Sequence, residues 1–143
     1  MKIKIPLQVI DMKGDGYHVL IEVMVGRKRY PLVLDTGASK TVFDLAVLRT
    51  HKKIDIRSTH HLSAGLGTLS MESFTAVLPA FKIGKLKLPG FEVAVLDLST
   101  INQAYAQLEH PQVLGVLGGD ILVRYNAVID YGKQRLILSA DAK

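Results

Sequence analysis

The sequence contains no cysteine among its 143 residues. Without thiols the chain can form neither a disulfide scaffold nor a metal site with thiolate ligands. The absence of cysteine excludes these two kinds of site. It is compatible with any cellular compartment, so it does not indicate where the protein resides. No linker or low-complexity segment divides the chain, and its length is that of an ordinary domain, so we predict one domain over residues 1–143.

Long apolar runs are also missing, and none approaches the roughly 20 residues that a membrane-spanning helix needs. The N-terminus carries lysines, but Gln8, Asp11, Lys13 and Asp15 interrupt it too soon for the apolar region of a signal peptide. We therefore expect no membrane partner, and a cytoplasmic location is favoured. The sequence leaves open whether this chain is trimmed from a longer or exported precursor.

Charged residues make up only 22% of the sequence, but the net charge is +5 and the isoelectric point is about 9.5. A basic protein can bind nucleic acid, yet the lysines and arginines are scattered and form no long basic helix. Arg27, Lys28 and Arg29 do cluster, but they follow Gly26 between two apolar runs, which is typical of a solvated hairpin tip. We expect no nucleic-acid partner.

What the sequence does contain is many short apolar runs separated by glycines, with 48% hydrophobic residues in all. This pattern is typical of many short strands around a real core. Asp44 is expected to cap a short helix at 45–49, Ser99 and Thr100 a second at 101–108, and a third follows Asp120. We predict a mostly-β fold with two or three short helices and strands at 3–10, 17–25, 30–35, 54–57, 70–79, 81–83, 91–96, 113–117, 127–130 and 135–138.

Residues 32–44, Leu-Val-Leu-Asp-Thr-Gly-Ala-Ser-Lys-Thr-Val-Phe-Asp, bring a carboxylate to the end of an apolar strand. An acid in this position must be hydrogen-bonded or used in chemistry, because burying an unpartnered carboxylate is costly. Gly37 permits a tight turn whose N–H approaches Asp35, and Thr36 offers a hydroxyl that can lock the turn. Ala38 and Ser39 are small enough for a second copy to come near.

Two interpretations of this acid stand side by side. Two carboxylates about 3 Å apart cannot both ionise, so they share one proton, and the pair can activate water and protonate a carbonyl. The alternative is a plain Asx turn that ends a strand. The Asp-Thr-Gly triplet alone does not choose between them.

Residues 34–39, Leu-Asp-Thr-Gly-Ala-Ser, resemble the active-site motif of retropepsin-like aspartic proteases, the single-lobe relatives of pepsin. That family has a second motif, two apolar residues and a glycine before a short helix, packed beneath the active-site loop. The sequence offers it twice, ending at Gly115 and at Gly118, with Ile121 and Leu122 on the helix. The resemblance covers residues 17–138, includes a closing hairpin at 127–132, and implies a closed, orthogonal β-barrel.

The resemblance also implies a role for each residue of the first motif. Asp35 would be the catalytic acid and base, and Thr36 would hydrogen-bond across to another copy. Gly37 would present backbone to the substrate, while Ala38 and Ser39 would edge the substrate cleft. The family covers its cleft with a glycine-rich flap, and the residues in the matching place are Ala64, Gly65, Leu66, Gly67 and Thr68.

No second acid of the same kind is found along the chain. Asp97 is followed by Leu and Ser, Asp130 is followed by a bulky Tyr, and Asp120 opens a helix, where capping accounts for it. We therefore predict a two-fold homodimer that places Asp35 beside its own copy. In retropepsins the termini often pair in a shared sheet, for which residues 1–10 and 135–139 are candidates.

Other ligands are less well supported. His51, His60 and His61 have no acidic partner at a metal-binding spacing, and surface histidines explain them better. The glycines at 65 and 67 lack the Lys and Ser or Thr of a phosphate loop. We expect no metal and no cofactor.

The resemblance predicts an aspartic endopeptidase that cleaves peptide or protein substrates. A non-catalytic module that binds peptides or another protein through the same cleft is the second hypothesis. A dimer with the two Asp35 carboxyls in hydrogen-bonding reach would favour the enzyme, and a stable monomer would favour the binding module.

Overall fold

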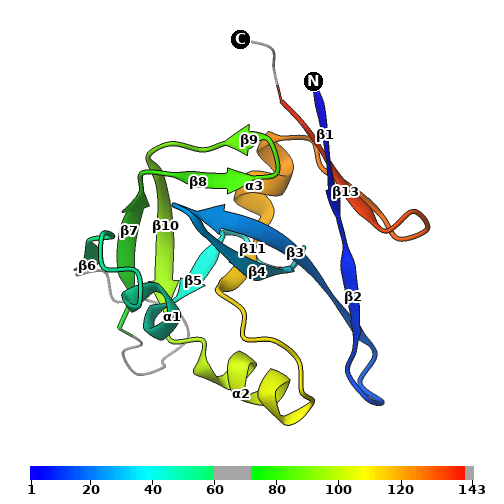
Figure 1. Cartoon of the computed structure of the whole chain (residues 1–143), viewed down its shortest axis with the longest axis horizontal. Coiled ribbons are helices and arrows are strands. Elements are labelled where there is room, and N and C mark those ends of the chain that lie inside the picture. Colours follow the sequence, from blue (N-terminus) through cyan, green and yellow to red (C-terminus); the bar gives the residue numbers. More distant parts are fainter. Residues whose placement is uncertain (60–71, 141–143) are drawn as a thin grey trace.

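The computed structural model describes residues 1–59 and 72–140, which form mostly-β structure with three short helices (Figure 1). The predicted flap residues 64–68, with His60 and His61, lie outside the described residues. None of the described helices is long and apolar enough to cross a membrane.

The strands are β1 (Lys2–Pro6), β2 (Gln8–Asp11), β3 (Tyr17–Val25), β4 (Lys28–Leu34), β5 (Val42–Asp44), β6 (Ile56–Ser58), β7 (Phe74–Leu78), β8 (Phe81–Ile83), β9 (Leu86–Lys87), β10 (Phe91–Leu96), β11 (Gly115–Leu117), β12 (Val128–Asp130) and β13 (Arg135–Ser139). The helices are α1 (Leu45–Arg49), α2 (Ser99–Gln107) and α3 (Gly119–Arg124).

The large sheet has the strand order β6-β7-β10-β5-β11-β4-β3-β8-β9, and β2 also pairs with β3. β11 lies at its centre, parallel to β4 and antiparallel to β5. The short strands β6 and β9 form the two edges, and within the described residues no pairing joins them. The predicted mostly-β class is confirmed, but the predicted closed barrel is not.

The small sheet has the order β1-β13-β12, and it places the first and last strands of the fold side by side (Figure 1). β1 runs antiparallel to β13, with Ile3 opposite Leu138. The terminal segments that were candidates for a sheet shared between two chains therefore pair here within one chain.

The predicted strand at 3–10 is wrong in one respect, because it is two strands in two different sheets. β1 ends at Pro6, and the N–H of Leu7 donates to the carbonyl of Gln134 (2.9 Å), which continues the β1–β13 pairing by one residue. β2 then pairs with β3 from Gln8 onward. The buried residues fall on odd positions up to Leu7 and on even positions from Ile10, and this change of phase accompanies the change of sheet.

Helix α1 begins as predicted, since the Asp44 carboxylate accepts from the N–H of Val47 (3.0 Å). The predicted capping of α2 by Ser99 or Thr100 is wrong. The N-cap is Leu98, whose apolar side chain cannot cap the helix, and the N–H of Leu98 donates to the distant Asp44 carboxylate (2.7 Å). Ser99 thereby becomes the first residue of the helix.

The main core lies between the large sheet, the small sheet and α3, where side chains such as Leu32, Phe43, Leu117 and Leu136 are fully buried. A second, smaller cluster packs α2 against the β2–β3 hairpin through Ile10, Leu20, Tyr105 and Val113. β4 contributes to both, so the residues at its C-terminal end are fixed from two sides.

Candidate functional site

Asp35 follows directly after β4 and is partly exposed. Its N–H donates to the carbonyl of Leu117 at the end of β11 (3.0 Å), which extends the parallel pairing of these two strands by one residue. One carboxylate oxygen accepts the N–H of Gly37 (2.9 Å). This hydrogen bond fixes one oxygen, while the exposed position of Thr36 and Gly37 leaves the turn open to solvent.

The loop after Asp35 rests on the turn between β11 and α3. The N–H of Gly119 donates to the carbonyl of Ala38 (2.7 Å), and the N–H of Asp120 donates to that of Ser39 (3.1 Å). A Cβ on Gly118 would lie 2.5 Å from the Lys40 carbonyl atoms, so only glycine fits there. The second glycine motif therefore lies directly against the loop that carries Asp35.

Gly115, within strand β11, is under the same steric constraint as Gly118. A Cβ at this position would lie 2.0 Å from the carbonyl oxygen of Val42 and 2.8 Å from the Cα of Phe43. The bare backbone of Gly115 lets β11 fit between β4 and β5. Gly115 and Gly118, the two glycines of the predicted second motif, therefore both allow backbone segments of the site to lie in close contact.

A buried threonine that sequence reasoning missed connects these pieces. Thr41 is 1% exposed, and its hydroxyl donates to the Asp120 carboxylate (2.8 Å) and accepts the N–H of Gly118 (3.1 Å). Its own N–H donates to the same Asp120 oxygen (3.0 Å). Asp120 also accepts the N–H of Ile121 within the first turn of α3, but the N-cap of this helix is Gly118 and no side chain caps it, so the predicted capping role of Asp120 is wrong.

The acids considered as partners of Asp35, and also Asp44, are engaged in structural hydrogen bonds. Asp130 accepts the N–H of Lys133 (2.9 Å) in the β12–β13 turn. Asp97 binds Ser99, and hydrogen bonds from the Ser99 side chain and then its N–H lower the pKa of the Asp97 carboxyl. Asp44, 2% exposed, joins α1 to the start of α2 through both oxygens.

Tyr105 on α2 is a second residue that sequence reasoning missed. Its ring is 1% exposed, and its hydroxyl forms a 2.6 Å hydrogen bond with His18 Nδ1 on β3. Burial, and secondly the charge of Asp35, raise the pKa of Tyr105 to about 12. The helical spacing of Ile101, Tyr105 and Leu108 indicated a buried face, but nothing in the sequence pointed to His18.

The packing of β4 explains why Tyr105 is within electrostatic reach of Asp35. Successive side chains of a strand point to opposite faces. Leu34 packs against the main core, whereas Val33 packs against the cluster that contains Tyr105. Asp35, two residues after Val33, continues on the Tyr105 side.

Thr36 lies at the rim of a hollow of about 430 Å³ on the α3 side of the loop. The hollow is mainly apolar, with Leu122, Val123, Ala127 and Ile129 among its lining. Val123 itself is 78% exposed. An apolar surface therefore adjoins the turn that carries the candidate acid.

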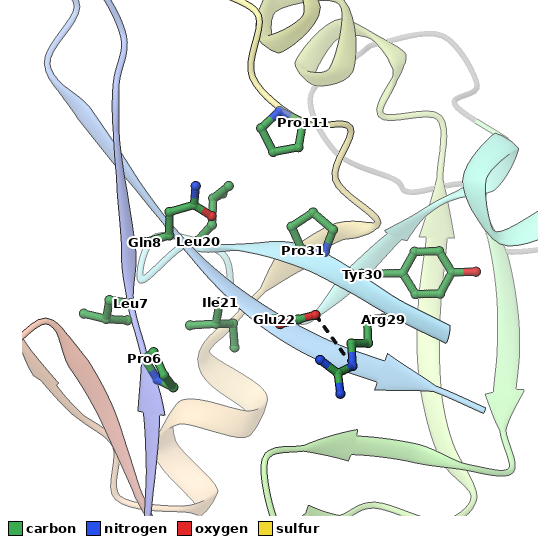
Figure 2. A pocket seen from close by; sticks show the side chains of 10 residues that line it. All are labelled: Pro6, Leu7, Gln8, Leu20, Ile21, Glu22, Arg29, Tyr30, Pro31 and Pro111. Carbon is green, nitrogen blue, oxygen red and sulfur yellow. Dashed lines mark ion pairs between the residues drawn. The ribbon is translucent and has the colours of Figure 1, made fainter. Parts of the chain in front are cut away.

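A different hollow, of about 440 Å³, lies between the β1–β2 segment and the β3–β4 pair (Figure 2). Among the described residues that line it, the one carboxylate is Glu22, which is 4.0 Å from the Arg29 guanidinium. Asp35 does not line this hollow. In the part of the chain that the structure describes, no three His, Asp or Glu side chains come together as a potential metal site.

Both the sequence and the fold are similar to those of known proteins. The sequence matches the aspartyl protease family over residues 21–121, more than half of the chain. No curated protein sequence matches the chain. The fold is similar to that of a retropepsin-like aspartic protease from Rickettsia conorii, with 22% identity, a TM-score of 0.55, and coverage of 96% of this chain and 89% of that one. It is also similar to the retroviral protease-like domain of Ddi1 from Leishmania major, with 13% identity, a TM-score of 0.54, and coverage of 85% and 88%.

Proposed function

Since the chain belongs to the aspartyl protease family, we propose that it is an aspartic endopeptidase that works as a homodimer, with Asp35 of each copy in one catalytic pair. The domain spans residues 1–143, and the substrates are peptides or proteins.

The observation that carries this proposal is the setting of Asp35. It is a partly exposed carboxylate at the end of β4, which pairs with strands on both sides, on a turn whose backbone is bound to Leu117. Among the described residues, the three acids that were considered as partners, Asp97, Asp120 and Asp130, are each engaged by local or structural hydrogen bonds. The proposal therefore takes the second carboxylate of the pair from another copy.

The chemistry follows from the proximity of two like acids. Two carboxyls about 3 Å apart hold a single proton, because both cannot be ionised together. The ionised carboxylate removes a proton from a water as that water attacks the scissile carbonyl, and the protonated partner donates to the carbonyl oxygen. One carboxyl must be neutral and the other charged, so we expect an acidic-to-neutral pH optimum.

The neighbours of Asp35 have matching roles in the proposal. Thr36 is exposed, and its hydroxyl has no hydrogen-bond partner within the described part of the chain, which suits a contact with the other copy. Gly37 presents backbone to the substrate, and Ala38 and Ser39 edge the cleft. The flap assignment of residues 64–68 is part of the same proposal.

The Asp35→Asn variant tests the proposal directly. Cleavage of a peptide library should be abolished, since the amide cannot take part in the shared-proton chemistry, while the circular dichroism spectrum stays unchanged. Adding an excess of Asp35→Asn to the parent protein should lower activity beyond simple dilution, because mixed dimers lack one carboxylate.

The matched control is Asp97→Asn, which changes another exposed acid with a comparable turn hydrogen bond. This variant should cleave as fast as the parent. Unchanged cleavage by Asp35→Asn would exclude Asp35 as the catalytic acid. A parent protein that is monomeric in sedimentation and binds peptides without cutting them would favour the non-catalytic binding module.

A further inference from the structure

Three segments that are distant in sequence form a strongly basic hollow on the large sheet. We name as the basic hollow the concave surface of about 700 Å³ that lies between the β3–β4 tip, the residues after α1, and β8. Five of its lining side chains are basic: Arg27, Lys28, Lys52, Lys53 and Lys82. Among the described residues, no carboxylate lines it.

The backbone beneath the basic hollow is held in place by hydrogen bonds. The N–H of Gly26 donates to the carbonyl of Ala80 (2.7 Å), which ties the β3–β4 tip to the turn before β8. The N–H of His51 donates to Leu48, and the N–H of Ile54 donates to His51, so the segment after α1 is ordered as well. The His51 ring lies close to Gly26, where a Cβ would be 3.1 Å from its Nε2. The cations therefore extend from a preformed surface.

Nearby acids do not neutralise these five cations. In the described part of the chain, the ion pairs are Arg29 with Glu22 and Arg57 with Asp55, and neither pair uses a cation of the basic hollow. Like charges gathered in one concavity repel one another, and a multivalent anion removes that repulsion on binding.

Ordinary surface chemistry explains only part of this arrangement. Lys52 and Lys53 follow the C-terminal end of α1, where the helix dipole favours cations. Arg27 and Lys28 suit a solvated hairpin tip. Neither explanation accounts for why the cations of the tip and those after α1 lie together with Lys82. Strand pairing places Lys82 opposite Met24, near the tip.

The lining also indicates the kind of anion. The one ring among its described residues is the His51 imidazole, which cannot form a stacking platform for successive bases. Their one hydrophobic member is Ala80, so the surface does not suit an acyl chain. Its size is within the range of small-molecule sites. We propose that the basic hollow binds a compact anion with several clustered phosphate groups, held by Lys and Arg contacts.

This site is separate from the proposed protease site. Lys28 and Leu34 are the two ends of β4, and at about 3.3 Å per residue the strand places the basic hollow roughly 20 Å from Asp35. Binding is therefore measurable whether or not the chain cleaves peptides.

Titration of the full chain with sodium tripolyphosphate in a calorimeter tests the proposal. We expect one saturable site whose affinity falls as salt is added, because bound counterions are released. The Lys53→Gln/Lys82→Gln double variant should bind about tenfold more weakly or worse, since hydrogen bonds to charged groups contribute that much. The Lys53→Arg/Lys82→Arg variant keeps the charge and should bind like the parent.

The matched control is Lys2→Gln/Lys133→Gln, which removes the same charge from exposed lysines on the small sheet and its turn. This control should change the affinity less than twofold, a margin of roughly 0.4 kcal/mol. Equal weakening in both double variants would mean that net charge, and not the basic hollow, attracts the anion, and would overturn the proposal.

A second arm identifies the source of the phosphates. The parent is sedimented with phosphatidylcholine vesicles that do or do not contain phosphatidylinositol bisphosphate. Lysine-dependent binding to the phosphoinositide vesicles assigns the phosphates to a lipid headgroup, and tripolyphosphate binding without vesicle binding assigns them to a free compound. Failure to bind either probe would overturn the proposal.

Discussion

At the residue scale, Tyr105 shows how burial and a neighbouring charge change the behaviour of a single side chain. Its hydroxyl lies inside the small cluster beneath α2, bound to His18. A tyrosinate at this position would be poorly solvated and would face the charge of Asp35, so the pKa of Tyr105 is raised to about 12.

The raised pKa predicts a loss of stability at high pH. The folded state holds the Tyr105 proton more tightly than the unfolded chain, whose tyrosine has a pKa of 10.0. The contribution to stability is therefore complete below pH 10 and is lost as the pH rises to about 12. Urea unfolding of the parent and of Tyr105→Phe across this range should show a smaller loss in the variant.

A Tyr131→Phe variant serves as the control for this measurement, because the Tyr131 ring is 64% exposed. Its stability should fall with pH as steeply as that of the parent. If Tyr105→Phe also lost stability as steeply as the parent, the coupling between the Tyr105 proton and folding would be disproved.

At the scale of elements, the site depends on how β11 and α3 meet the loop after β4. Gly118 fits against the Lys40 carbonyl and donates to Thr41. The following Gly119 contacts the same loop at ordinary distances, since a Cβ added to it would lie 3.5 Å from the carbonyl oxygen of Ala38. The two glycines are adjacent, yet only the first is under a steric constraint.

This difference predicts opposite outcomes for two neighbouring substitutions. Gly118→Ala should destabilise the fold by about 3 kcal/mol, because the new methyl meets backbone that cannot move aside. Gly119→Ala should stay within about 0.5 kcal/mol of the parent. Chemical denaturation measures both, and equal stability of the two variants would show that the loop after Asp35 is not packed as tightly as described.

At the scale of the whole molecule, the proposed dimer needs a surface next to Asp35. The apolar hollow beside Thr36 offers one, and Val123 is exposed within it. In a two-fold dimer the same patch occurs in both copies, so one substitution alters the interface twice.

The Val123→Glu variant should therefore weaken self-association roughly tenfold or more, since a carboxylate buried at an interface is left unpaired. Peptide cleavage should fall with it at low protein concentration, while the melting temperature of the isolated chain stays unchanged. Sedimentation across a dilution series measures the association. Val77→Glu, a similar change at an exposed valine on β7, should affect neither property. A Val123→Glu protein that dimerises like the parent would exclude this surface.

Elements that depend on interactions between residues close in sequence were predicted better than features that depend on residues far apart in sequence. The strand at 17–25 and the helix at 45–49 were predicted with their observed bounds. Both depend on local signals, a glycine-rich turn before the strand and Asp44 as N-cap. The bond of Leu7 to Gln134 at the end of β1, and that of Leu98 to Asp44 before α2, join residues that are far apart in sequence.

The sequence by itself determined the mostly-β class and the candidate acid Asp35, because alternation, turn residues and the Asp-Thr-Gly triplet are local patterns. Tertiary structure alone decided what surrounds that acid: the Thr41–Asp120 contact, and Tyr105 with His18. It also decided that the cations of the hairpin tip meet Lys52, Lys53 and Lys82. These groups lie tens of residues apart, and only the packing of strands and helices brings them within the few ångströms over which hydrogen bonds and charges act.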